Sequence, residues 1–114
     1  MEPIEWPSEW TRAALPLAVL ALVSDEDAYG YLIAQRLAAA GFGTVKGSTL
    51  YPLLARLEHD GSLASTWQDG AGGPGRKYYS VTEAGRRALD EHRVAWADFT
   101  TRTMAVLGEK KESR

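Results

Sequence analysis

The 114-residue sequence contains no cysteine. Disulfide bonds and thiolate metal sites are therefore excluded, and a reducing compartment is the simplest environment for the protein. Histidine is scarce as well: His59 and His92 are the only two, and no carboxylates stand near them at the spacing of a metal site. No serine lies in a Gly-x-Ser-x-Gly segment. We expect a protein with no metal, no cofactor and no enzymatic activity.

Long apolar runs are also missing. The longest covers residues 13–23, which is too short to span a bilayer, and it contains Pro16. The residues that precede it are acidic, whereas a signal peptide begins with basic residues. These features predict a cytoplasmic protein that does not enter a membrane. Its length and its 45% apolar and 25% charged residues suit one domain with a modest core.

Excess positive charge is absent too, because the net charge is −2. The charges are unevenly distributed, however. Residues 1–28 carry six acidic and one basic side chain, whereas residues 29–81 carry three acidic and five basic ones. The middle of the chain is therefore locally positive, which is compatible with a focused phosphate-binding surface.

Two helices are predicted in the first part of the chain. We expect one over residues 8–23, capped by Ser8, although Pro16 in its interior removes a backbone hydrogen bond. A second helix is expected over residues 28–40, with Asp27 as its N-cap and a glycine directly after its end.

The segment GSTLYPLLARLEHDG, residues 47–61, predicts a third helix with two unlike faces. Leucines at positions i, i+3, i+4 and i+7 form one apolar face: Leu50, Leu53, Leu54 and Leu57. The other face carries small, hydrogen-bonding or mildly basic side chains: Ser48, Thr49, Pro52, Ala55, Arg56 and His59. A face of this composition indicates contact with a partner.

A β-hairpin is predicted next. Residues 62–69 and 76–81 are rich in strand formers and flank a glycine-rich turn. The glycines of this turn have the spacing of a dinucleotide fingerprint, but a strand follows them where that motif needs a helix, so nucleotide binding is rejected. Thr82 then caps a long helix that ends at Leu107, and residues 108–114 are expected to form a flexible tail.

This order of elements predicts a winged helix-turn-helix, mainly α with a small β-hairpin (α+β), followed by a long C-terminal helix. Residues 1–81 are expected to form the DNA-binding domain, with the first helix contributing to a dimer, and residues 82–107 the dimerisation helix. In such a fold the third helix can enter the major groove, while glycines at the hairpin tip let the wing backbone approach DNA.

Three blocks, YGYLIAQRL, GSTLYPLLARLEHDG and GGPGRKYYSVTEAG, resemble the short form of the PadR family of bacterial transcriptional regulators over residues 10–107. The resemblance implies a homodimer that binds a palindromic operator in double-stranded DNA, usually as a repressor, and releases it when an effector or stress signal arrives. Lys46 stands where the family commonly has a capping serine, and Pro16 interrupts a helix that is usually unbroken. The DNA-binding residues expected from the segment and from the resemblance are Lys46, Ser48, Thr49, Tyr51, Pro52, Arg56, Gly73, Arg76 and Lys77.

The last helix carries a seam of mostly apolar residues at alternating spacings of three and four. A small domain on its own does not need so long an amphipathic helix, so we expect this one to pack against the first helix of a second copy. The expected interface comprises Leu15, Leu89, His92, Trp96, Phe99, Thr103 and Val106.

Two questions stay open at this stage. Trp96 and Phe99, together with Trp10, either line a cavity for a small aromatic or drug-like effector or simply pack the interface. Tyr29 and Tyr31 are either phosphate contacts or half-buried core residues.

The alternative to a DNA-binding regulator is a winged-helix module that binds another protein without specific DNA binding, because the fold serves both roles.

Overall fold

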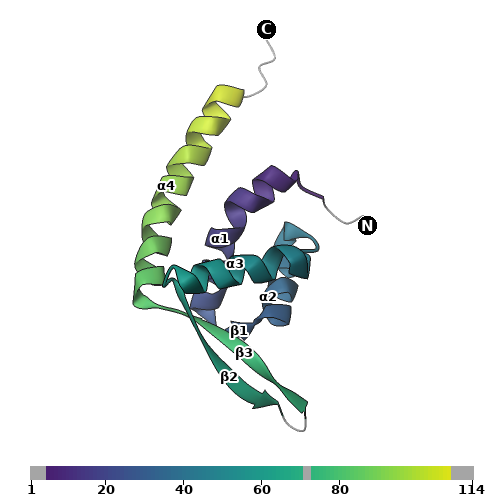
Figure 1. The fold of residues 1–114 in the computed structure, drawn as a ribbon. Coiled ribbons are helices and arrows are strands. Elements are labelled where there is room, and N and C mark those ends of the chain that lie inside the picture. The colour runs from purple at the N-terminus through teal and green to yellow at the C-terminus, as the bar shows by residue number, and fades with distance from the viewer. Residues whose placement is uncertain (1–4, 71–72, 109–114) are drawn as a thin grey trace.

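The computed structural model describes residues 5–70 and 73–108 (Figure 1). Of the expected flexible tail, residues 109–114 lie outside the described residues. The helices and strands follow the predicted order, with a short additional strand between the first two helices. Their bounds are α1 Ser8–Asp25, β1 Ala28–Tyr29, α2 Gly30–Leu37, a π-helical turn Ala38–Phe42, α3 Gly47–His59, β2 Leu63–Gly70, β3 Gly73–Val81 and α4 Glu83–Leu107.

The three strands form one antiparallel sheet in the order β1-β3-β2. Residue Tyr79 in the central strand pairs with Ala28 on one side and Ser65 on the other, which places its side chain over the helices. Tyr79 is buried, whereas its neighbour Tyr78 is only half-buried, as alternation along a strand requires. The outer part of β2 and β3 extends beyond the core as the wing.

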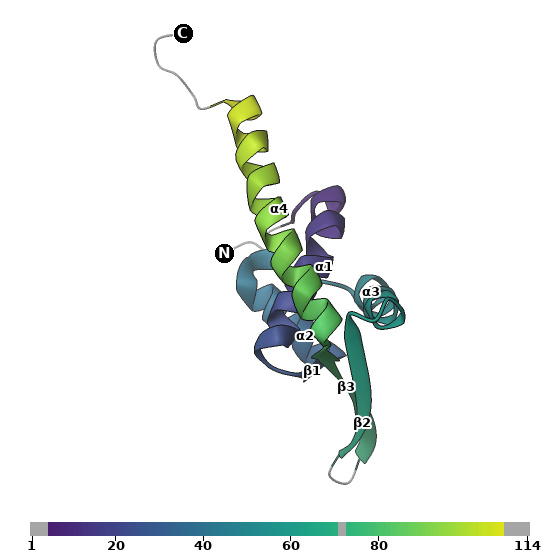
Figure 2. The ribbon, with the colours of Figure 1, turned by 90° about the vertical axis from the view of Figure 1, so that its left-hand side faces the viewer.

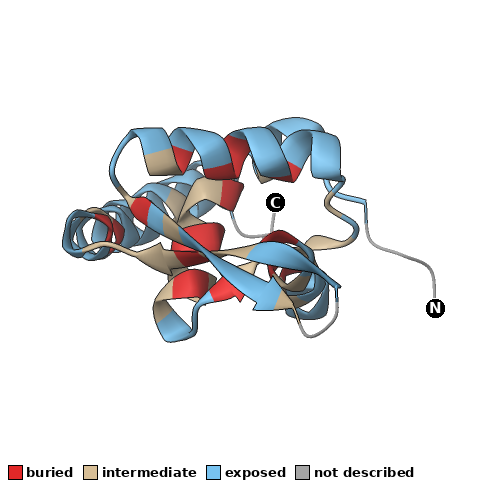
Figure 3. Cartoon of the chain, turned by 60° about the horizontal axis from the view of Figure 1, so that its bottom comes forward, coloured by how far each residue is buried: buried red, intermediate tan, exposed pale blue. Residues whose placement is uncertain are grey.

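The core lies where α1, α2 and α3 meet the base of the sheet. The leucine face predicted for α3 is buried, as are Ile33 and Leu37 of α2. Leu63 of β2 and Leu89 of α4 close the same cluster. Figure 3 shows that buried positions gather where the helices and the sheet meet, whereas the outer wing is exposed.

The N-caps predicted for α1 and α2 are wrong, although α1 begins at residue 8 as predicted. Ser8 is the first residue of α1 and not its cap, because Pro7 holds the N-cap position without a side-chain hydrogen bond. Asp27 does not cap α2, because β1 follows it and Tyr29 is the N-cap. Pro16 lies inside α1, which continues past it to Asp25.

The start of α4 is as predicted and is firmly attached to the domain. The backbone N–H of Gly85 donates to Thr82 Oγ1 at 2.9 Å, and this hydroxyl donates to the carbonyl oxygen of Gly61 at 2.6 Å. The wing and the far end of α4 project in opposite directions from the core (Figures 1 and 2). Beyond Leu89, no described residue of α4 is buried. Within the described part of the chain, none of the helices has the length and apolar character needed to cross a membrane.

Candidate nucleic-acid interface

The outer face of α3 is open to solvent along its whole length. All the small, hydrogen-bonding and basic side chains predicted there are exposed, as is Lys46 at the N-cap position. Lys46 makes no side-chain capping hydrogen bond to the helix. Because the first backbone N–H groups of a helix have no partner within it, this end of α3 is suited to a polar or anionic ligand.

Tyr51 links α3 to the start of α2. A Cβ atom built on Gly30 would lie 2.5 Å from Cε1 of the Tyr51 ring, so the ring occupies the space that a larger residue would need. A Cβ atom built on Gly47 would lie 3.4 Å from the other edge of the same ring, and 52% of Tyr51 remains exposed. Tyr51 therefore faces the start of α2 on one side and is open to solvent on the other.

The wing is joined to the end of α3 by a charged cluster. The ammonium of Lys77 lies 3.2 Å from Oε1 of Glu58, and the hydroxyl of Ser65 donates to Oε2 of the same carboxylate at 2.6 Å. The hydrogen bond from Ser65, and after it that from Lys77, holds the pKa of Glu58 below its ordinary value. The hydrogen bond to Glu58 raises the pKa of Lys77. Lys77 is therefore a fixed cation whose position depends on an acid of α3.

Arg76 is held separately from Lys77. Neighbouring residues of a strand point to opposite faces, and Arg76 lies over the ring of Tyr29, with its Cζ atom 4.5 Å from the ring centroid. Tyr29 in turn packs edge-on against Tyr78. The open question about Tyr29 and Tyr31 therefore has a different answer for each residue: Tyr29 is half-buried and supports a wing cation, whereas Tyr31 is 63% exposed.

A groove of about 440 Å³ separates the helix-turn-helix from the wing. Trp67 is one of its lining residues and is 72% exposed, but the sequence analysis did not identify it as a site residue. Trp67 pairs with Lys77 across the hairpin, a register that the structure shows. The predicted residues brought together along this groove are Tyr51, Arg76 and Lys77.

A second groove, of about 210 Å³, runs between α1 and α3. It brings the predicted residues Thr49, Pro52 and Arg56 together with Arg12. Arg12 was missed because it is the only basic residue in the acidic first quarter of the chain. Gly73, at the other extreme of the site, is exposed on the wing.

The predicted interface residues fall into two groups. Leu15 and Leu89 are buried in the core of the same chain and leave little surface for a second copy. The others lie on the exposed side of α4, where Trp96 and Phe99 pack against each other with their centroids 5.9 Å apart.

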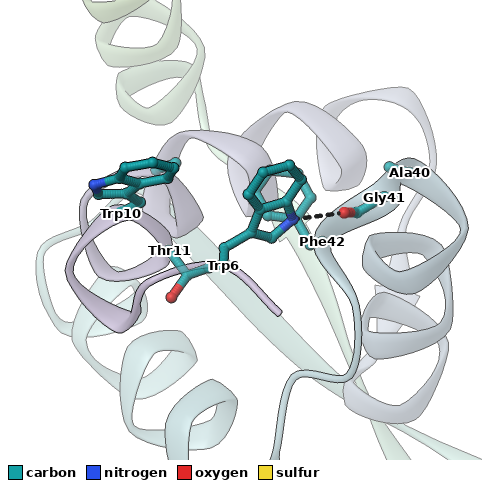
Figure 4. Close-up of a pocket in the computed structure, with 7 residues that line it drawn as sticks. Trp6, Trp10, Thr11, Ala40, Gly41 and Phe42 are labelled. Atoms are coloured by element: carbon teal, nitrogen blue, oxygen red, sulfur yellow. Dashed lines mark hydrogen bonds between the residues drawn. The ribbon is translucent and has the colours of Figure 1, made fainter. Parts of the chain in front are cut away.

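The three rings expected to share an effector cavity are not all placed in one pocket of the described chain. Trp10 lines an open pocket together with Trp6 and Phe42 (Figure 4). Trp96 lines a neighbouring one, of about 240 Å³, between α1 and α4. The two pockets share Ala14 and Phe42, and Phe99 lines neither.

Comparisons with known proteins agree with this geometry. A family model described as the transcriptional regulator PadR-like family matches residues 19–91. The transcriptional regulator Rv3488 of Mycobacterium tuberculosis is 42% identical over 87 residues, which are 76% of this chain and 79% of that protein.

Solved structures extend the similarity to the fold. A PadR family transcriptional regulator from Eggerthella lenta superposes with a TM-score of 0.81 at 37% identity, covering 90% of this chain and 89% of that one. A PadR-like transcriptional regulator from Bacillus cereus gives a TM-score of 0.79 at 29% identity, covering 90% and 99%. The winged-helix fold predicted from the sequence is confirmed.

Proposed function

This chain belongs to the PadR-like family of transcriptional regulators, and on that premise we propose that it binds a palindromic operator in double-stranded DNA as a homodimer. The protein is a regulator and not an enzyme. We propose further that it represses transcription until a small aromatic effector or another signal releases it. The observation that carries the proposal is the open face of α3, which is free of acidic side chains from Lys46 to Leu57 and lies between two grooves that contain cations.

The face of α3 fits the major groove. This groove is about 12 Å wide and admits one helix whose N-terminal residues meet the base edges. Ser48 and Thr49 hold hydrogen-bonding groups at this end of α3, and both are exposed. Their side chains are small enough to let the helix backbone come close. Direct base contacts are therefore assigned to Ser48 and Thr49, with Tyr51 and Pro52 beside them.

Cations flank this face on both sides and supply contacts to phosphates. Arg56 and Arg12 lie along the groove between α1 and α3, and Lys77 and Arg76 lie along the wing. Such contacts add affinity for any sequence and set the position of the protein on the duplex. The exposed glycine at position 73 lets the tip of the wing approach the DNA backbone.

The dimer is proposed from the unpartnered part of α4. Large apolar side chains remain exposed there, and monomeric proteins rarely leave a continuous apolar strip uncovered: Phe99, Met104, Val106 and Leu107. Pairing through the seam that includes His92, Trp96, Phe99, Thr103 and Val106 gives a two-fold protein. Such a protein reads two half-sites about one helical turn apart or a multiple of it.

Release by an effector is proposed from the exposed rings of Trp10, Trp96 and Phe99, which are 60%, 36% and 60% exposed. A flat apolar molecule that stacks on these rings in one arrangement of the dimer shifts the population toward that arrangement. DNA is released if the two α3 helices then no longer match the half-site spacing.

A salt titration tests the proposal against the alternative of a protein-binding module. Binding to the DNA upstream of the protein's own gene is measured by anisotropy at several salt concentrations, with random duplex of equal length as the control. We expect log K to fall steeply with log salt and the upstream DNA to be preferred by about 10³-fold or more. Equal and weak binding to both duplexes would support the protein-binding module instead.

Two substitutions sharpen this test. Thr49→Ala is expected to change the preferred base at one position, while Lys77→Ala weakens binding to every duplex and lowers the salt slope by about one.

A further inference from the structure

We propose that the groove between the helix-turn-helix and the wing holds one sugar-phosphate strand of duplex DNA, and that the ring of Trp67 packs against a deoxyribose of this strand. The inference rests on the DNA binding proposed above and adds to it a contact that carries no charge and reads no base. Segments far apart in the sequence line the groove, namely the start of α2, the recognition helix α3 and the hairpin.

The groove lies where a backbone strand has to pass. Figure 2 shows α3 and the wing on the same side of the molecule. When α3 occupies the major groove and the wing extends over the neighbouring minor groove, one sugar-phosphate strand runs between them, because such a strand is the wall that separates the two grooves of a duplex. Tyr51 of α3 and Trp67 of β2 both line the groove, which is therefore the space that these elements leave for that wall.

The lining of the groove matches the two kinds of surface that such a strand presents. A sugar-phosphate strand alternates charged phosphates with deoxyribose rings whose faces are largely apolar. The groove supplies the cations Arg76 and Lys77, and none of the described residues that line it is acidic. The exposed rings of Tyr31, Tyr51 and Trp67 supply apolar surface, and the two tyrosines add hydroxyl donors. A free phosphate would use only the cations, so the combination favours a strand.

The ring of Trp67 lies within the groove and not at the tip of the hairpin. Trp67 pairs with Lys77, and the pair of Gly70 with Gly73 is three residues farther along β2. At about 3.3 Å a residue, Trp67 is about 10 Å back from the tip. A Cβ atom built on Gly75 would lie 3.6 Å from Cε3 of Trp67, so the ring lies against the backbone of this glycine. A wedge between base pairs would stand at the tip, whereas a ring in this position meets the strand that passes through the groove.

Lys77 places the phosphate beside this ring. Directly paired residues of neighbouring strands have their side chains on the same face of the sheet, so Lys77 and Trp67 are neighbours there. The ammonium of Lys77 is held 3.2 Å from Oε1 of Glu58 and has three N–H donors, which leaves donors for a phosphate. Each phosphate of a strand is bonded to a deoxyribose on either side. A phosphate bound by Lys77 therefore brings a deoxyribose to Trp67.

Affinities for two duplexes distinguish this contact from a charged contact or a base contact. Binding of the full chain to the upstream DNA and to random duplex is measured by anisotropy at several salt concentrations. Trp67→Ala should weaken binding to both by the same factor, about tenfold, and leave the salt slope unchanged, because the lost ring carries no charge. Trp67→Phe keeps a ring and should lose at most about threefold. Thr66→Ala, exposed on the opposite face of the hairpin, is the control and should bind as the wild type does.

Two further measurements would not respond to a merely structural role of Trp67. In the wild-type chain labelled with fluorotryptophan, the signal assigned by its absence from Trp67→Phe should shift when either duplex binds. The strand itself is located with upstream DNA that carries one uncharged methylphosphonate linkage at each position in turn. We expect a linkage whose neutralisation weakens binding of the wild type but has little further effect on Lys77→Ala.

Each measurement has a result that overturns the inference. An unchanged affinity of Trp67→Ala, or a fluorine signal that does not move when the wild type binds DNA, would remove Trp67 from the interface. A loss confined to the upstream DNA would mean that the ring reads bases. If no linkage depended on Lys77, the strand would lie outside the groove. A wild-type chain that prefers no DNA would contradict the proposed function itself, whereas the other results contradict only this inference.

Discussion

Glu58 and Lys77 join the last turn of the recognition helix to the wing, with 3.2 Å between the carboxylate and the ammonium group. Ser65 binds the second oxygen of the same carboxylate. The angle between α3 and the wing therefore depends on an acidic residue at the edge of a surface proposed to face phosphates. We expect such an acid to weaken attraction to DNA in general and to hold the wing at one angle to α3.

Replacing the acid should exchange specificity for affinity. In Glu58→Gln we expect tighter binding to random duplex, by about three- to tenfold, a salt slope steeper by about one, and a smaller preference for the operator. Anisotropy titrations at several salt concentrations measure all three quantities. Asp60→Asn is the matched control, because it removes the same charge from an exposed residue that forms no ion pair within the described residues. Identical changes in the two variants would show that only net charge matters.

The same pair gives the folded protein a defined pH dependence. The pKa of Glu58 is lowered, so its stabilising contribution is present above the ordinary value of 4.5 and is lost as the pH falls through the folded value. The pKa of Lys77 is raised, so its contribution is present below 10.5 and is lost as the pH rises through the folded value. Wild type and Glu58→Gln should therefore differ most in free energy of unfolding between these limits, and the difference should disappear once Glu58 is protonated. Urea unfolding at fixed ionic strength measures it. A difference that does not shrink as the pH falls below 4.5 would contradict this assignment.

Gly30 is expected to matter for DNA binding more than for folding. In Gly30→Ala the new methyl group displaces the ring of Tyr51, which lies 2.5 Å from the position of the added carbon. Tyr51 is half exposed and free to move outward, so we expect a small change in melting temperature and a loss of operator affinity of about tenfold. Gly47→Ala is the control, because its added carbon meets the same ring at an ordinary 3.4 Å. A folding defect in Gly30→Ala without a binding defect would argue against a role for Tyr51 at the interface.

Gly85 is expected to matter for folding. A Cβ atom at this position of α4 would overlap the backbone carbonyl oxygen of Ser62, and backbone cannot move as a side chain can. Gly85→Ala should lower the free energy of unfolding by about 2 kcal/mol or more. Ala84→Gly, at the exposed neighbouring position, should cost at most about 1 kcal/mol through helix propensity. Urea denaturation measures the free energy of unfolding of both variants. Equal losses in the two would mean that α4 can move away from Ser62 at little cost in stability.

Most of the fold was predictable because strong periodicity and caps mark it. The leucine face of α3 and the Thr82 cap of α4 are both where the sequence placed them. The strand β1 was missed because two residues have no period of their own and are extended only through pairing with β3. The candidate site followed from α3 and the hairpin, but Arg12 and Trp6 join their sites only through tertiary packing, which no local pattern encodes.

The seam of α4 makes the last prediction, which concerns assembly. Phe99 is 60% exposed on the seam, whereas Val94 is 72% exposed on the other side, since five residues at about 100° each separate the two by about 140°. Phe99→Glu should raise the dissociation constant of the dimer by at least about tenfold, because a charge replaces a ring that the partner is proposed to cover. Val94→Glu adds the same charge to the same helix and should leave the dimer intact. Sedimentation equilibrium measures both. Operator affinity should fall with Phe99→Glu and not with Val94→Glu, because a monomer holds only one half-site. If Phe99→Glu were monomeric but bound the operator as tightly as the wild type, DNA recognition would not depend on dimerisation.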